Sequence, residues 1–201
     1  MSSRERIFAG ALLAMICIAS GGASPAPILD MAATSRCDLK GFSTDTDRNG
    51  AKIRSAPRAD APVIGGLPPP SDITGQGDTQ GPAFEIIGAK NGWLLIRNAD
   101  TGFKGPGWIS GGLVGFQIVS RALRAVPSSS ARVVAKLYGT GPTGGNWGPE
   151  GYEVRRVHGC QGKFADVTIV LPPRMKPPPG REKPLRGWVD HVCSLQLTTC
   201  N

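Results

Sequence analysis

Beyond residue 23 the sequence contains no apolar stretch long enough to span a membrane as a helix and no continuous apolar pattern with the period of a helix. Aromatic residues make up only 6% of the chain, and histidine occurs twice. Glycine and proline are abundant instead, at 28 and 18 of 201 residues, and both are disfavoured inside helices. These features exclude a helical bundle and favour an all-β fold of many short strands.

The residue types that bind metals or phosphates have no diagnostic spacing. The histidines and cysteines form no C-x-x-C or H-x-x-x-H pattern, so we predict no metal site, and no cofactor is expected. The glycine-rich stretch GTGPTGGNWGPEG (139–151) has no Lys-Ser/Thr after it, which argues against a phosphate-binding loop. We interpret it as a flexible insertion in which Trp147 is a candidate contact residue.

The N-terminus has the pattern of a secretory signal peptide. Arg4 and Arg6 precede an apolar run of about thirteen residues (7–19), which ends in small residues and is short for a permanent membrane span. We expect cleavage after Ala23. Cys17 is not preceded by the small residue that a lipoprotein signal requires. The mature chain is therefore predicted to be periplasmic or secreted, without a transmembrane segment.

Removal of residues 1–23 leaves four cysteines, Cys37, Cys160, Cys193 and Cys200. An even number in an exported chain favours disulfides, because the compartment is oxidising. Four cysteines allow three pairings. We expect Cys160 to pair with Cys193 or Cys200 inside the C-terminal half, and Cys37 to take the remaining one.

Positive charge is concentrated in the second half of the chain. Residues 24–120 carry nine basic and nine acidic side chains, whereas residues 121–201 carry twelve basic and five acidic ones. Five of the basic residues belong to or border the proline-rich stretch 171–184: Arg174, Lys176, Arg181, Lys183 and Arg186. Such a surplus suits an anionic partner, and export makes nucleic acid the least expected one.

The chain contains an internal repeat. IRSAPRADAPVIGGL (53–67) aligns without a gap on LRAVPSSSARVVAKL (123–137), at an offset of seventy residues. Further on, FEII (84–87) matches YEVR (152–155), NGWLLI (91–96) matches QGKFADV (161–167), and GWIS (107–110) matches GWVD (187–190). The pattern of each copy predicts five short strands. Among them are 51–54, 63–67 and 93–97 in the first copy, and 122–124, 133–138 and 164–170 in the second. Five short strands in about seventy residues favour a small, strongly bent barrel.

This series of motifs resembles the bacterial SH3-type (SH3b) domain, in which a stretch like LNVRSGPS, a hairpin with NGW and a terminal GW follow in that order. The resemblance implies two SH3-like β-barrels in tandem, at 47–116 and 117–201, behind an N-terminal segment (24–46). The second copy departs from the pattern, since Lys163-Phe164 replaces the hairpin tryptophan and insertions interrupt residues 139–151 and 172–186. In such barrels a groove receives extended peptide or glycan. The resemblance implies that it is lined by Arg54, Arg58, Phe84, Trp93 and Trp108 in the first copy and by Arg124, Tyr152 and Trp188 in the second.

The motif His158-Gly159-Cys160 permits three interpretations: a nucleophile with its base, a disulfide cysteine beside an uninvolved histidine, or part of a metal site. A cell-wall L,D-transpeptidase carries a similar Ser/Thr-His-Gly-Cys, but Val157 stands here in place of the Ser/Thr. Because exported cysteines usually form disulfides, we predict that Cys160 is half of a disulfide and that His158 is exposed to solvent. No catalytic residue is assigned.

The sequence thus predicts an exported, non-enzymatic binding or targeting protein of the cell envelope that recognises peptidoglycan or an envelope peptide. Two alternatives stay open. One is a cell-wall hydrolase or transpeptidase that depends on Cys160, and the other is a structural secreted protein stabilised by its disulfides.

Overall fold

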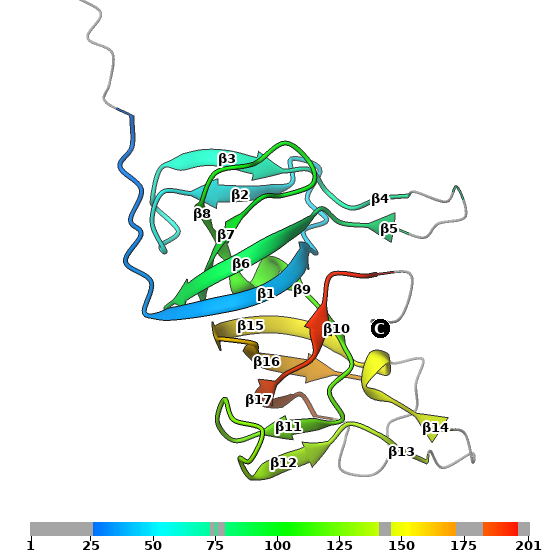
Figure 1. Ribbon diagram of the computed structural model, residues 1–201. Coiled ribbons are helices and arrows are strands. Elements are labelled where there is room, and N and C mark those ends of the chain that lie inside the picture. The colour runs from blue at the N-terminus through cyan, green and yellow to red at the C-terminus, as the bar shows by residue number, and fades with distance from the viewer. Residues whose placement is uncertain (1–25, 73–74, 76–78, 141–145, 172–182, 197–201) are drawn as a thin grey trace, which may run out of the picture.

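The computed structural model describes residues 26–72, 75, 79–140, 146–171 and 183–196, and these form an all-β protein, as predicted (Figure 1). The signal peptide prediction concerns residues outside the described ranges, and so does Cys200. The only helical elements in the described part are two single 3-10 turns, η1 (Gly111–Leu113) and η2 (Pro149–Gly151). None of the described helices is long and apolar enough to cross a bilayer.

The larger sheet has seven antiparallel strands in the order β3-β2-β8-β7-β6-β1-β9. Their bounds are β1 (Ser35–Ser43), β2 (Ala51–Arg54), β3 (Val63–Leu67), β6 (Ala83–Lys90), β7 (Trp93–Arg97), β8 (Gly107–Ser110) and β9 (Val114–Gly115). The longest of these, β1, lies in the N-terminal segment that precedes the first repeat. That segment is therefore part of the sheet.

The second sheet has five antiparallel strands in the order β12-β11-β17-β16-β15. Their bounds are β11 (Ala122–Arg124), β12 (Val133–Lys136), β15 (Glu153–Gln161), β16 (Phe164–Val170) and β17 (Leu185–Val189). Three two-stranded ladders complete the described strands: β4 (Ser71–Asp72) with β5 (Thr79–Gln80), β13 (Gly139–Thr140) with β14 (Asn146–Trp147), and β10 (Gln117–Ile118) with β18 (Val192–Cys193).

The sequence repeat is visible as a repeat of strand order. β3-β2-β8-β7-β6 in the first sheet corresponds to β12-β11-β17-β16-β15 in the second. Arg54 pairs with Trp108 in β8, and the matching Arg124 pairs with Trp188 in β17. The ladder is also irregular at the same place, just before Arg54 and just before Arg124. The two halves therefore have the same architecture, which each half builds from its own residues.

Five of the six strand ranges named from the repeat match the observed bounds, and the sixth ends at Lys136 instead of Tyr138. The more specific prediction of two closed barrels is not confirmed. None of the sheets in the described part of the chain closes on itself, and a separate two-stranded ladder interrupts each copy, β4–β5 between β3 and β6 and β13–β14 between β12 and β15.

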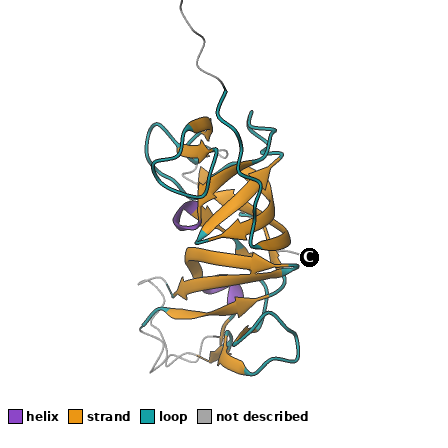
Figure 2. Ribbon diagram, turned by 90° about the vertical axis from the view of Figure 1, so that its left-hand side faces the viewer, coloured by secondary structure: helices purple, strands orange, loops and turns teal. Residues whose placement is uncertain are grey.

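The two sheets lie one above the other, as Figures 1 and 2 show from two sides. Their buried residues form one hydrophobic core. Residues of both halves belong to the same buried cluster, including Ile53, Leu94 and Ile109 from the first and Val157 and Val167 from the second. Strand β15 packs against β1, β6, β9 and η1. The contact is so close at Gly111 that an added Cβ atom would lie 1.8 Å from the main-chain oxygen of Val157. The two halves are therefore one folding unit.

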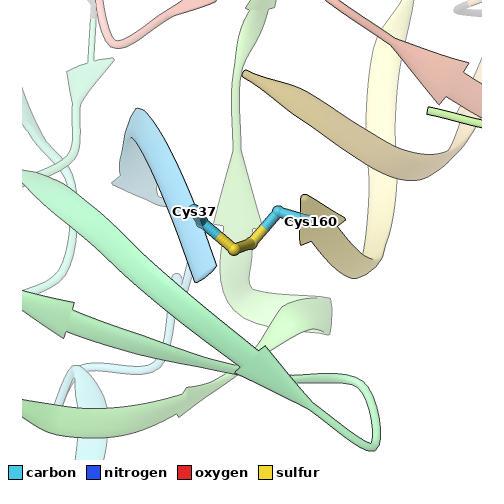
Figure 3. The surroundings of a disulfide bond; sticks show 2 residues. All are labelled: Cys37 and Cys160. Atoms are coloured by element: carbon cyan, nitrogen blue, oxygen red, sulfur yellow. A yellow bond between two sulfur atoms is a disulfide. The ribbon is translucent and has the colours of Figure 1, made fainter. Parts of the chain in front are cut away.

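A disulfide between Cys37 and Cys160 joins β1 to β15, and our prediction that Cys160 pairs within the C-terminal half is wrong (Figure 3). The prediction treated the stretch before the first repeat as a separate segment. In the structure β1 lies beside β15, and main-chain hydrogen bonds hold the two together. Gly162 N donates to Arg36 O at 2.8 Å, and Asp38 N donates to Gly162 O at 2.9 Å. Cys193 is also disulfide-bonded.

Candidate functional site

The motif His158-Gly159-Cys160 lies at the end of β15, and its cysteine is disulfide-bonded. Cys160 is 1% exposed, and its sulfur is bonded to that of Cys37. A bulge between Val157 and Gly159 interrupts the regular pairing of β15 with β16. His158 is half-buried, not exposed as predicted, because its Nε2 lies 2.8 Å from Thr168 Oγ1. Burial lowers the pKa of His158; nearby Arg186 and Arg156 also lower it, and Asp166 opposes them.

Arg54 and Arg124 have the same structural role in the two halves. Nη1 of Arg54 donates to the main-chain oxygen of Ala61 at 2.7 Å, and Nη1 of Arg124 donates to that of Ala131 at 3.0 Å. Each arginine thus bridges the proline-containing loop that follows its strand. The repeated arginine fixes the shape of this loop, and the Nε atom of Arg124 is buried.

In the first half, Arg54 and Trp93 line a pocket of about 370 Å³. Half-buried Trp93 lies there beside acidic and basic side chains; the other lining residues are Asp45, Asp47, Asn49, Gly50, Lys52, Ala59, Ser110 and Leu113. Arg58 is not among them, since it is exposed and forms an ion pair with Asp60 at 2.6 Å. Phe84, which is 3% exposed, belongs to the core.

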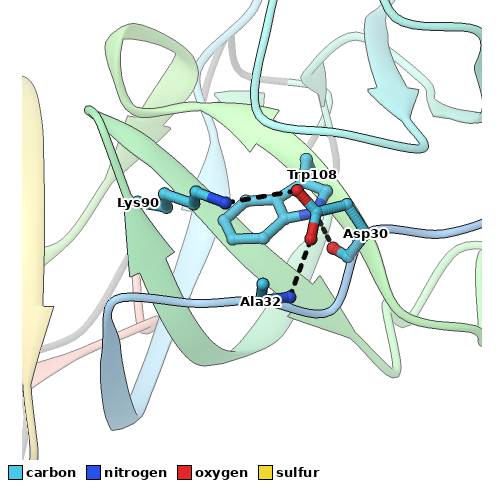
Figure 4. A network of polar contacts seen from close by, with 4 residues as sticks. All are labelled: Asp30, Ala32, Lys90 and Trp108. Atoms are coloured by element: carbon cyan, nitrogen blue, oxygen red, sulfur yellow. Dashed lines mark hydrogen bonds and ion pairs between the residues drawn. The ribbon is translucent and has the colours of Figure 1, made fainter.

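Trp108 is fully buried because the N-terminal segment crosses it (Figure 4). Its Nε1 donates to the main-chain oxygen of Asp30 at 2.6 Å, and Asp30 N donates to Ser55 O at 2.8 Å. The Asp30 carboxylate accepts from Ala32 N at 2.9 Å and pairs with Lys90 at 3.3 Å. The hydrogen bond from Ala32 N and the charge of Lys90 lower the pKa of Asp30. Residues 29–34 therefore lie on the sheet like a bound peptide.

Among the described residues, none is hydrogen-bonded across the matching face of the second half as Asp30 is in the first. This face of the second half carries a pocket of about 410 Å³, which we call the arginine pocket. Its lining residues are Arg124, Ala125, Arg132, Val134, Asp166, Arg186, Gly187 and Trp188. The Arg186 guanidinium donates to both oxygens of Asp166, at 3.3 and 2.9 Å, and this pairing raises the pKa of Arg186. Three arginines against one carboxylate leave the pocket positive.

A third hollow, of about 650 Å³, lies between the halves. Tyr152 lines it together with Phe42 and Phe116, but Tyr152 is only 5% exposed. Gln196 borders it and is held by two hydrogen bonds of 2.9 Å with the main chain of Gly81. Since two of the three aromatic rings are buried core residues, this hollow offers little ring surface to a ligand.

The eight predicted groove residues and the candidate contact residue Trp147 thus separate into distinct places. Arg54 and Trp93 share one pocket, Arg124 and Trp188 share another, and Tyr152 lies in the hollow between the halves. Phe84 and Trp108 are buried, Arg58 is on the surface, and Trp147 lies in β14, where its side chain is outside the described part. Arg132, which lines the arginine pocket, was not predicted as a site residue, and Arg186 was named only as part of the basic stretch. The offset of seventy could have found Arg132, because it takes the place of Pro62.

No group of three or more histidine, cysteine, aspartate or glutamate side chains in the described ranges is arranged to hold a metal ion. Comparison of the chain with protein-family models, curated proteins and solved structures finds no match.

Proposed function

We propose that this chain is an exported, non-enzymatic binding protein of the cell envelope, built from two SH3-type modules, and that it recognises peptidoglycan or an envelope peptide. The observation that carries the proposal is the segment 29–34, which lies across the first sheet and is held there by main-chain hydrogen bonds to Ser55 and Ala89 and by the indole of Trp108. Main-chain hydrogen bonds of this kind are how sheets hold extended peptides.

The SH3-type assignment is supported by the repeated motifs and by the common order of five antiparallel strands in both halves. The repeated Arg-Trp pairing, Arg54 with Trp108 and Arg124 with Trp188, places the same residue types on the same face twice. Two modules with one ancestral surface suit a protein that holds an elongated ligand.

The location in the envelope is supported by the N-terminal signal pattern and by the disulfides at Cys37, Cys160 and Cys193, which persist in oxidising compartments. The alternative function, a hydrolase or transpeptidase, needs the thiolate of Cys160. In the structure that sulfur is bonded to Cys37. Alkylation of the mature protein separates the two functions, because a nucleophile would be modified without prior reduction.

Co-sedimentation of mature residues 24–201 with purified sacculi, across a salt series, tests the proposal. We expect pelleting at low salt that weakens as salt rises, since the surplus charge of the second half is screened. The whole mature chain is needed, because the halves share a core and deletion of one would expose it. If neither sacculi nor immobilised envelope extract retains the protein at low salt, the proposed function is wrong.

A further inference from the structure

The arginine pocket occupies the place that the N-terminal segment covers in the first half. Asp30 is hydrogen-bonded to Ser55 and Trp108, and Leu95 is opposite Trp108 in the neighbouring strand. The pairing of the strands makes Asp166 the counterpart of Leu95, since each is opposite the β8 or β17 tryptophan. The counterparts of Ser55 and Trp108 are Ala125 and Trp188. All three counterparts line the arginine pocket.

The tryptophans of the two faces differ in what they bind. Trp108 is 0% exposed and its indole nitrogen donates to Asp30, whereas Trp188 is only half-buried. Among the described residues the indole nitrogen of Trp188 donates to no acceptor. A partly exposed ring with an unused donor is the kind of group that anchors a peptide main chain.

The side chains around the two tryptophans differ in charge. Arg132 replaces Pro62, and Asp166 replaces Leu95, in a pocket that Arg186 also lines. Arg132 is exposed, and within the described part of the chain its guanidinium makes no hydrogen bond or ion pair. Arg186 is 61% exposed, although it is paired with Asp166. The face that residues 29–34 cover in the first half, where Asp30 is the one charged residue of that stretch, is positive in the second half.

We propose that the arginine pocket binds an extended, acidic peptide segment of a partner protein, in the manner in which residues 29–34 lie on the first sheet. Trp188 donates to a main-chain carbonyl of this peptide, and Arg132 and Arg186 bind its carboxylates. Charge complementarity favours this occupant, because planar guanidinium groups bind carboxylates with two parallel hydrogen bonds. The inference rests on the proposed function only for the envelope location of the partner.

Three fluorescein-labelled peptides probe the pocket in the mature chain. The first has the sequence of residues 26–34, APILDMAAT; the second is the acidic form APIEDEAAT; and the third is the basic form APIKDKAAT. We expect fluorescence anisotropy at low salt to show that the acidic peptide binds at least about tenfold more tightly than the basic one. Equal affinities would overturn the proposal.

Variants locate the binding. The double variant R132Q/R186Q is expected to lose about tenfold in affinity for the acidic peptide. D166N removes the carboxylate that neutralises Arg186, so it should bind the acidic peptide about threefold more tightly, which a purely structural role of Asp166 would not cause. R97Q is the matched control, because Arg97 is a half-exposed arginine paired with Glu85 at 2.7 Å in the first sheet, outside the pocket. Thermal unfolding of each variant verifies that it is folded.

The outcomes separate this inference from the proposed function. Acidic-peptide binding that R132Q/R186Q weakens, in a protein that neither sacculi nor envelope extract retains, supports the pocket and removes the proposed function. If the protein pellets with sacculi but binds the acidic and basic peptides equally, the proposed function is supported and the acidic-peptide pocket is wrong. Displacement of the acidic peptide by soluble peptidoglycan fragments overturns the proposal in favour of a wall ligand. Self-association that R132Q/R186Q abolishes overturns it in favour of a second copy of the chain.

Discussion

Cys37 and Cys160 lie 123 residues apart in the sequence, yet they join two strands that pack side by side between the halves of the molecule. The disulfide closes a long loop. A cross-link that closes a long loop reduces the entropy of the unfolded chain more than one that closes a short loop. Its position also explains why the halves cannot rotate as independent modules.

Replacement of both cysteines, in C37A/C160A, should therefore lower the free energy of unfolding by about 2–5 kcal/mol. Urea denaturation followed by tryptophan fluorescence measures this difference. The wild type under reducing conditions provides the comparison, and it should shift in the same direction. A midpoint that does not move in the double variant would show that the shared core alone holds β1 against β15.

Gly111 provides a second test of the contact between the halves. In G111A the new methyl group would meet the main-chain oxygen of Val157, so the two sheets must separate slightly. We expect a loss of about 1–3 kcal/mol in the free energy of unfolding, the usual cost of overpacking. Gly105 is the matched control, because nothing lies within 4 Å of a Cβ atom there, and G105A should unfold at the wild-type midpoint.

Stability should depend on pH through His158. Its pKa in the folded protein lies below the ordinary value of 6.5, so the fold favours the neutral ring. As pH falls from about 6.5, the unfolded chain binds a proton before the folded one does, and stability decreases. H158Q keeps a hydrogen-bonding group beside Thr168 without titrating. The difference in urea midpoint between pH 7.5 and pH 5.5 should be smaller in H158Q than in the wild type, and an unchanged difference would contradict this account.

Much of the repeated architecture could be predicted from the sequence, because apolar alternation and turn residues are local signals. In β16, for example, Ala165, Val167 and Ile169 are buried while the residues between them are not. The longest strand of the first sheet, β1, was missed. Its buried positions after Leu39 are Gly41 and Ser43, so the strand has almost no apolar alternation to detect.

The candidate site was only partly predictable for a different reason. The match of GWIS (107–110) with GWVD (187–190) placed Trp108 and Trp188 at equivalent positions, but exposure depends on what covers each ring. That depends on residues 29–34, which lie outside the repeat and have no counterpart among the described residues of the second half. Similarly, the disulfide could not be assigned from spacing, because it depends on β1 lying between β6 and β15.

The cover over Trp108 leads to the last prediction. D30P removes the N–H group that donates to Ser55 and disturbs the carbonyl that accepts from Trp108, so residues 29–34 should detach from the sheet. The ring of Trp108 would then meet solvent, and acrylamide should quench the tryptophan fluorescence more strongly than in the wild type.

The control variant is A26G, which changes a residue before the segment. D38P would not serve as a control, because Asp38 N also donates a hydrogen bond, to Gly162. If quenching in D30P equals that in A26G, the segment is held by contacts other than those at Asp30. If it rises, the freed face should also bind the peptide APILDMAAT supplied in solution, which would show that the first half recognises an extended chain by the same contacts that it makes with its own.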